Sequence, residues 1–128
     1  MASGKLEGNE ERQREELELV LARAHAPYSR FRVAARMISR DGFFVDGCNV
    51  ENASFGLSLC AERVAAFRAL SRGMRAFRTL LIVSSGSDPV TPCGACRELL
   101  LRLAPDLEVV MFGAGETLRA RVSHLLPS

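Results

Sequence analysis

Two largely apolar runs constrain the fold of this chain most strongly. Residues 79–84 (TLLIVS) and 107–112 (LEVVMF) are rich in aliphatic and β-branched side chains and show little polar alternation. Such runs are typical of strands that are covered on both faces of a sheet. A helical segment from about Thr91 to Ala104 separates them. We therefore expect two parallel strands joined by a right-handed crossover, in a sheet covered by helices.

The rest of the chain supplies further helices and strands. Apolar residues at helical spacing indicate helices, β-branched and aromatic runs indicate strands, and an Asp-Gly pair favours a hairpin turn. In chain order we expect a helix over 10–24, strands over 31–38 and 43–50 joined at Asp41-Gly42, a loop over 49–59, a helix from about 60 to 73, the helix at 91–104 with Thr91 as its N-cap, and a short edge strand over 117–122. The expected fold class is α/β, a three-layer α-β-α sandwich around a mixed, roughly five-stranded sheet.

Length and charge exclude several classes of protein. The chain has 128 residues, which suits one domain over residues 9–128 behind a flexible N-terminal tail over residues 1–8. Seventeen basic and 15 acidic side chains leave a net charge of +2, too balanced for a nucleic-acid or membrane surface. A charged N-terminus and the lack of an apolar span indicate a cytoplasmic protein. In a reducing compartment, cysteines serve metal or catalytic roles more often than disulfides.

Three of the four cysteines stand at the starts of expected helices. Cys60 opens one helix, while Cys93 and Cys96 open the next and share a face because they are three positions apart. A helix N-terminus favours the thiolate form, which is the form that binds metal. Catalytic zinc commonly takes three protein ligands and leaves a fourth position for water. Cys48 lies within the hairpin and lacks the spacing for a closed four-cysteine site, so we expect it to be a small buried residue.

Glu62 favours a catalytic metal site over a purely structural one. It stands two residues after Cys60, in the first turn of the expected helix. Alone it would be an ordinary acid that the helix dipole favours at this end. A structural zinc site needs no carboxylate there, whereas a site that activates water needs a proton shuttle. Beside three candidate thiolates, the catalytic interpretation is the stronger one.

These motifs together resemble the cytidine deaminase family, specifically its small homotetrameric kind. The resemblance is carried by residues 60–63 (CAER), 92–97 (PCGACR) and 47–54 (GCNVENAS), with weaker matches at 27–33 and 125–127. It implies zinc-dependent hydrolytic deamination of cytidine or deoxycytidine in pyrimidine salvage. The implied substrate is a small nucleoside, with no nucleic-acid or membrane partner. A homotetramer is implied by the resemblance alone.

The resemblance also implies roles for individual residues. Cys60, Cys93 and Cys96 correspond to zinc ligands, and Glu62 to the group that carries protons between water and the pyrimidine. Three thiolates leave a zinc complex formally at −1, which weakens its Lewis acidity. Arg63 and Arg97 directly follow motif residues and are candidates to donate hydrogen bonds to the sulfurs.

The substrate-binding positions carry over in the same way. Asn49 and Glu51 correspond to the pair that holds the ribose 3′-hydroxyl, and Phe31 to an aromatic that packs against the pyrimidine. The backbones of Ala53 and Ala61 correspond to partners of the polar edge of the base. Phe55 stands where the family often has a Tyr that reaches a neighbouring subunit's site.

One departure and three alternatives remain open at this point. The family usually has an aromatic about two residues beyond the Leu-Leu-Pro of positions 125–127, where this chain stops at Ser128, so we expect that stacking contact to be missing. A modified cytosine nucleoside, such as a nucleoside antibiotic, is an alternative substrate. A non-enzymatic zinc module and a dithiol oxidoreductase using the CxxC of Cys93 and Cys96 are alternatives from other classes.

Overall fold

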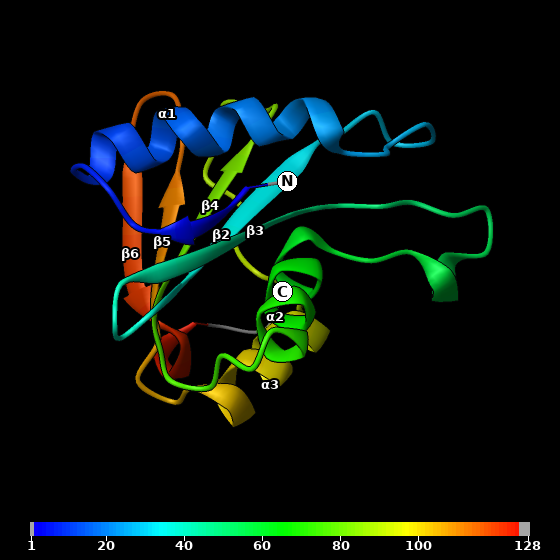
Figure 1. The fold of residues 1–128 in the computed structure, drawn as a ribbon. Coiled ribbons are helices and arrows are strands. Elements are labelled where there is room, and N and C mark those ends of the chain that lie inside the picture. The colour runs from blue at the N-terminus through cyan, green and yellow to red at the C-terminus, as the bar shows by residue number, and fades with distance from the viewer. Residues whose placement is uncertain (1, 126–128) are drawn as a thin grey trace.

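One mixed sheet of six strands organises the chain, in the spatial order β1-β3-β2-β4-β5-β6 (Figure 1). The structure is a computed structural model, and it describes residues 2–125 apart from the side chain of Phe55. The strands are β1 (Ser3–Lys5), β2 (Val33–Ser39), β3 (Phe43–Cys48), β4 (Phe77–Ser84), β5 (Glu108–Phe112) and β6 (Thr117–Arg121). The pair β4 and β5 is parallel, and every other neighbouring pair is antiparallel. The parallel pair confirms the crossover expected from the two apolar runs.

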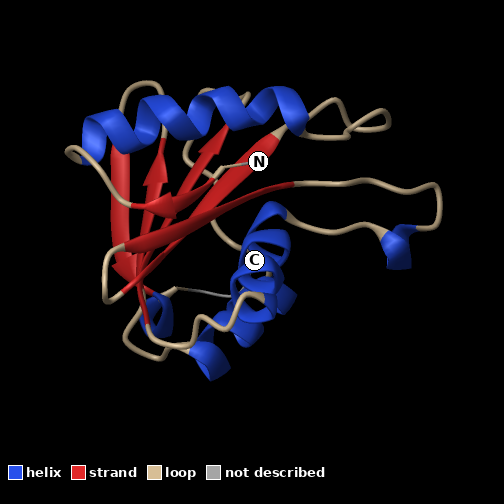
Figure 2. Cartoon of the chain, viewed as in Figure 1, coloured by secondary structure: helices blue, strands red, loops and turns tan. Residues whose placement is uncertain are grey.

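Helices cover both faces of this sheet. The helices are α1 (Glu10–Val20), α2 (Ala61–Ser71) and α3 (Gly94–Leu103), with short 3-10 helices at Leu21–Arg23, Phe55–Leu57 and Val122–His124. Helix α1 crosses one face, while α2 and α3 lie together on the other (Figure 2). Each face has its own cluster of buried apolar side chains. The expected three-layer α-β-α sandwich is confirmed, with six strands where roughly five were expected.

The sixth strand corrects one expectation. We expected residues 1–8 to be a frayed tail, but Ser3–Lys5 pairs with Phe43–Val45 as strand β1. The edge of β3 leaves backbone N–H and C=O groups unpaired, and any extended segment can satisfy them whatever its side chains. A pairing of this kind leaves no apolar pattern in the sequence.

Alternation along β2 and β3 decides what each face of the hairpin carries. Even-numbered residues of β3 face α1, and odd-numbered ones face α2. Gly47 lies under α2, where an added Cβ would come within 2.4 Å of the backbone nitrogen of Ala65. Only a glycine allows the helix to approach the strand so closely. The first turn of α2 is thereby seated directly on the hairpin.

The opposite face of the hairpin holds a buried ion pair. Arg36 on β2 donates to Asp46 on β3 through two bonds, Nε to Oδ1 at 2.7 Å and Nη2 to Oδ2 at 2.9 Å. The two side chains are 1% and 0% exposed. Glu16 of α1 also accepts from Arg36, at 2.8 Å, so the pair ties α1 to the sheet. Among residues 2–125, no helix is long and apolar enough to cross a membrane.

Removing Asp46 tests this arrangement. Asp46→Ala leaves the buried guanidinium of Arg36 without its main partner, which costs about 3–5 kcal/mol of unfolding free energy. Asp106→Ala is the control, because Asp106 meets Arg121 at 3.9 Å on the surface and such pairs contribute at most about 1 kcal/mol. Urea unfolding measures both. Equal, small losses in the two variants would contradict the importance of the buried pair.

Candidate metal centre and active site

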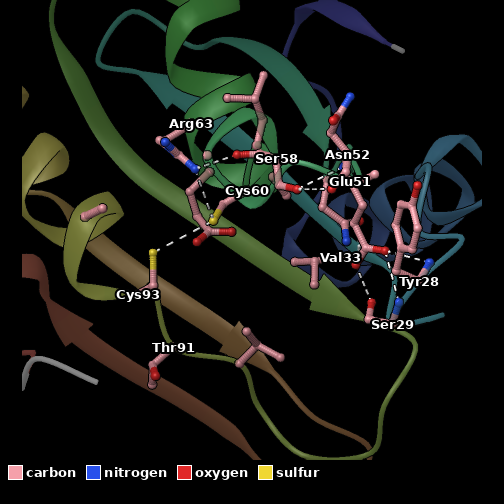
Figure 3. Close-up of a pocket in the computed structure, with 18 residues that line it drawn as sticks. Tyr28, Ser29, Val33, Glu51, Asn52, Ser58, Cys60, Arg63, Thr91 and Cys93 are labelled. Carbon is pink, nitrogen blue, oxygen red and sulfur yellow. Dashed lines mark hydrogen bonds between the residues drawn. The ribbon is translucent and has the colours of Figure 1, made fainter.

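Three cysteines from two helix starts converge at one point. Cys60 is the N-cap of α2, Cys93 is the N-cap of α3, and Cys96 lies in the first turn of α3. Their sulfur atoms all lie within 4.8 Å of one another. The Sγ atoms of Cys60 and Cys93 face each other at 3.8 Å (Figure 3). The predicted cluster is therefore brought together, although α3 begins at Gly94 and not after an N-cap at Thr91.

The spacing of these sulfurs fits a zinc ion. Zinc–sulfur bonds are about 2.3 Å long, so two tetrahedral sulfur ligands lie about 3.8 Å apart. The Cys60–Cys93 separation has this value. Among the described residues, Cys48 is not part of the cluster. It lies at the end of β3 in the core beneath α1, on the opposite face of the sheet, which excludes it as a fourth ligand in this arrangement.

Neighbouring side chains control the charge of the sulfurs. A hydrogen bond from Cys96 and another from Arg63 stabilise the Cys60 thiolate and lower the pKa of Cys60 to about 5. The hydrogen bond that the Cys96 thiol donates to Cys60, together with burial, raises the pKa of Cys96. Without metal, the pair thus holds one thiolate, on Cys60, and one thiol, on Cys96.

Of the two arginines predicted to assist the sulfurs, Arg63 reaches them. Its Nη2 lies 3.8 Å from the Sγ of Cys60 and donates to the carbonyl oxygen of Ser58 at 3.0 Å. Arg97 is directed elsewhere, since its Nε donates to the carbonyl oxygen of Leu125. The expectation for Arg97 is corrected because this contact turns its guanidinium toward the 122–125 segment.

Glu62 is buried beside the cluster. It is the second residue of α2 and is only 4% exposed. Burial, followed by the negative charge on Cys60, raises the pKa of Glu62 to about 7. A carboxyl group with a pKa near neutrality both accepts and releases protons under ordinary conditions, as general acid–base chemistry requires.

A cavity of about 790 Å³ opens onto this centre. Four predicted substrate residues line it, namely Asn49, Glu51, Ala53 and Ala61. The other lining residues are Tyr28, Ser29, Val33, Asn52, Gly56, Ser58, Leu59, Cys60, Glu62, Arg63, Val90, Thr91, Cys93 and Ala95. The cavity therefore joins the sulfur cluster at one end to the Asn49–Glu51 segment at the other (Figure 3).

The polar end of the cavity is tightly hydrogen-bonded. Asn49 accepts from the backbone nitrogen of Val33 at 2.9 Å and donates to the carbonyl oxygen of Phe31 at 2.8 Å. Glu51 accepts from the backbone nitrogens of Tyr28 and Ser29, each at 3.1 Å. Hydrogen bonds, first of all from the Ser29 hydroxyl, lower the pKa of Glu51, so the carboxylate is ionised at neutral pH.

Three predicted positions lie elsewhere or are not described. Phe31 is not among the cavity-lining residues, and its ring lies against Gly86, where an added Cβ would be 2.9 Å from Cε1. The packing of this ring against a bound pyrimidine stays a prediction. Phe55 begins a 3-10 helix, but its side chain lies outside the described part of the structure. The expected loss of a stacking aromatic falls at residues 126–128, which also lie outside it.

Sequence reasoning assigned no role to Tyr28 and Ser29. They lie just before β2, which pairs with β3 so that Ala34 stands opposite Cys48. In an antiparallel hairpin, the residues before the first strand lie beside those that follow the second. The pairing register of β2 on β3 could have predicted that Tyr28 and Ser29 lie next to Glu51.

Fold and site together define a class of protein. An α-β-α sandwich that brings three cysteine sulfurs together beside a buried carboxyl group and an open cavity is typical of a metal-dependent hydrolase that activates water. The sequence model described as "Cytidine and deoxycytidylate deaminase zinc-binding region" matches residues 9–113. The chain belongs to this zinc-dependent deaminase family.

Individual relatives agree with this assignment. The cytidine deaminase of Halalkalibacterium halodurans is 44% identical over 106 residues, which cover 81% of this chain and 80% of that protein. The crystal structure of cytidine deaminase from Burkholderia pseudomallei superposes with a TM-score of 0.87 at 40% identity, covering 94% of this chain and 98% of that one. A more distant relative, the blasticidin-S deaminase of Bacillus cereus, is 30% identical over 103 residues, or 74% of each chain.

The acidity of Cys60 gives a direct test of the site's electrostatics. In metal-free protein, a pKa of about 5 keeps Cys60 as a reactive thiolate at pH 6, whereas an ordinary thiol is almost fully protonated there. Iodoacetamide labelling followed by peptide mass mapping should therefore modify Cys60 at pH 6 and leave the buried Cys48 unmodified. Saturating zinc should suppress the labelling. A labelling midpoint for Cys60 at pH 8–9 would contradict the assignment.

Proposed function

We propose that this protein catalyses the zinc-dependent hydrolysis of cytidine and deoxycytidine to uridine and deoxyuridine, with release of ammonia. The observation that carries the proposal is the position of Glu62, which is 4% exposed and lines the cavity together with Cys60 and Cys93. A buried carboxyl group with a pKa of about 7 is costly to a protein that does not use it.

Cys60, Cys93 and Cys96 would hold the zinc ion. When bound, zinc acts as a Lewis acid that makes a water molecule more acidic. The hydrogen bond from Arg63 to the Cys60 sulfur withdraws negative charge from a set of ligands that would otherwise be strongly electron-donating. Arg63 thus supports the acidity that the reaction needs.

Glu62 would move the protons of the reaction. Its carboxylate takes a proton from the attacking water and delivers it to N3 of the cytosine ring as oxygen bonds to C4. The same carboxyl group then carries the remaining hydroxyl proton to the amino group, which leaves as ammonia. Because Glu62 moves both protons, the reaction requires no second acid or base from the cavity.

The charges at the far end of the cavity favour a nucleoside over a nucleotide. We propose that Asn49 and Glu51 hold the sugar 3′-hydroxyl, and that the backbones of Ala53 and Ala61 meet the polar edge of the base. Among the described lining residues, Arg63 is the one Lys or Arg, and it is engaged with Cys60 and Ser58. Because Glu51 is ionised and the one Lys or Arg among the described lining residues is already engaged, a phosphorylated substrate such as deoxycytidylate is disfavoured.

A modified cytosine nucleoside is the second candidate substrate. The 30% identical blasticidin-S deaminase favours it, but the 44% identity to a cytidine deaminase favours cytidine more strongly.

We further propose that the protein assembles as a homotetramer, with Phe55 reaching a neighbouring subunit, and acts in cytoplasmic pyrimidine salvage. Exposed apolar side chains in the 57–59 segment support assembly, since Leu57 is 67% exposed and Leu59 is 38% exposed.

Replacing Glu62 tests the proposed function. Glu62→Gln preserves the shape of the side chain but cannot accept a proton, so kcat for cytidine should fall by at least about 10²–10⁴-fold while zinc content stays stoichiometric. Ultraviolet absorbance follows the reaction, and atomic absorption measures the metal. Glu98→Gln, at an exposed pair with Arg102 on α3, is the matched control. Normal turnover by Glu62→Gln would refute the assigned role.

A further inference from the structure

Ser29 is the centre of a hydrogen-bonded ring around the carboxylate of Glu51. The Oε1 atom of Glu51 accepts from the backbone nitrogens of Tyr28 and Ser29, each at 3.1 Å. Its Oε2 atom accepts from the hydroxyl of Ser29. Figure 3 shows Tyr28 and Ser29 on one segment, with the side chain of Glu51 directed toward them.

The direction of the Ser29 hydroxyl is set by a second bond. The backbone nitrogen of Phe31 donates to the Oγ of Ser29 at 3.0 Å, so the hydroxyl proton is left to point toward Glu51. The turn is closed by Arg30, whose φ of 59° is unusual for a residue other than glycine. Its nitrogen donates to the carbonyl oxygen of Ala26 at 2.9 Å. The segment is thus shaped to present its donors to the carboxylate.

Counting donors and acceptors shows what remains for a ligand. A carboxylate offers about four acceptor positions, and Glu51 has two filled on Oε1 and one filled on Oε2. One acceptor position on Oε2 stays open. The amide of Asn49 uses one N–H on Phe31 and one oxygen position on Val33, which leaves one N–H and one oxygen position. Both residues line the cavity, and the free N–H of Asn49 together with the open oxygen of Glu51 would complement a single hydroxyl group.

We infer that Ser29 is a positioning residue that aims the open oxygen of Glu51 at the substrate's 3′-hydroxyl. The inference rests on the proposed function, because it takes the ligand to be a cytosine nucleoside. Without the Ser29 hydroxyl, Oε2 loses this partner and only the two backbone N–H bonds to Oε1 hold the carboxylate, so the direction of Oε2 is less well fixed. Ser29 would then determine specificity for the sugar without itself touching the reacting atoms.

The test compares two substrates that differ only at the inferred contact. Wild-type enzyme should lose about 10- to 100-fold in kcat/KM on going from cytidine to 3′-deoxycytidine, the size of one hydrogen bond to a charged group. Ser29→Ala should lose about tenfold with cytidine, mainly through KM, and less than about twofold with 3′-deoxycytidine. The ratio between the two substrates is a readout that a general loss of structure would not change.

Three further variants make the test specific. Ser29→Thr retains the hydroxyl and should restore most of the discrimination. Ser87→Ala removes an exposed hydroxyl from another loop and should leave both substrates unaffected. Adding Ser29→Ala to Glu51→Gln should cause little further loss with cytidine, because the two residues act through one contact. Thermal melting and zinc content confirm that each variant is folded and loaded.

The possible outcomes separate the inference from the proposed function. Equal losses by Ser29→Ala on both substrates would overturn the inference. Wild-type enzyme that deaminates cytidine and 3′-deoxycytidine equally well would also overturn it, while leaving the proposed deamination intact. Failure of the wild-type enzyme to deaminate cytidine at all would instead refute the proposed function.

Discussion

Mutual repulsion among three sulfur ligands is the constraint on which this site depends. Three thiolates within 4.8 Å of one another cannot all be ionised unless positive charge is supplied. The fold supplies part of it from the N-termini of α2 and α3 and from the guanidinium of Arg63, and a bound zinc ion would supply the rest. Because both helix starts must meet at one point, the packing of α2 on β3 at Gly47 has a direct chemical consequence.

The same hairpin that seats α2 also builds the opposite end of the cavity. Strand β3 runs under the helix at Gly47 and continues into Asn49 and Glu51. A single stretch of backbone therefore sets the separation between the metal centre and the polar end. The buried Arg36–Asp46 pair ties this hairpin to α1 on the other face. Stability and substrate geometry thus share the same two strands.

Much of this arrangement could be predicted because it is encoded locally. The apolar runs predicted β4 and β5 as parallel strands, and the positions of Cys60, Cys93 and Glu62 at helix starts predicted the chemical centre. Features that depend on distant pairing could not be predicted in this way. Strand β1 exists because β3 has an open edge, and the direction of Arg97 depends on the carbonyl of Leu125. Ser29 meets Glu51 only through the register of β2 on β3.

The chemistry of this site depends on one zinc ion that three sulfurs hold and whose fourth position is left for water. X-ray absorption at the zinc edge of purified, zinc-loaded protein measures the number and type of these ligands. We expect three sulfur neighbours at about 2.3 Å and one oxygen neighbour at about 2.0 Å. A shell of four sulfurs, or a fourth ligand supplied by a protein nitrogen, would rule out a water-activating zinc site of this kind.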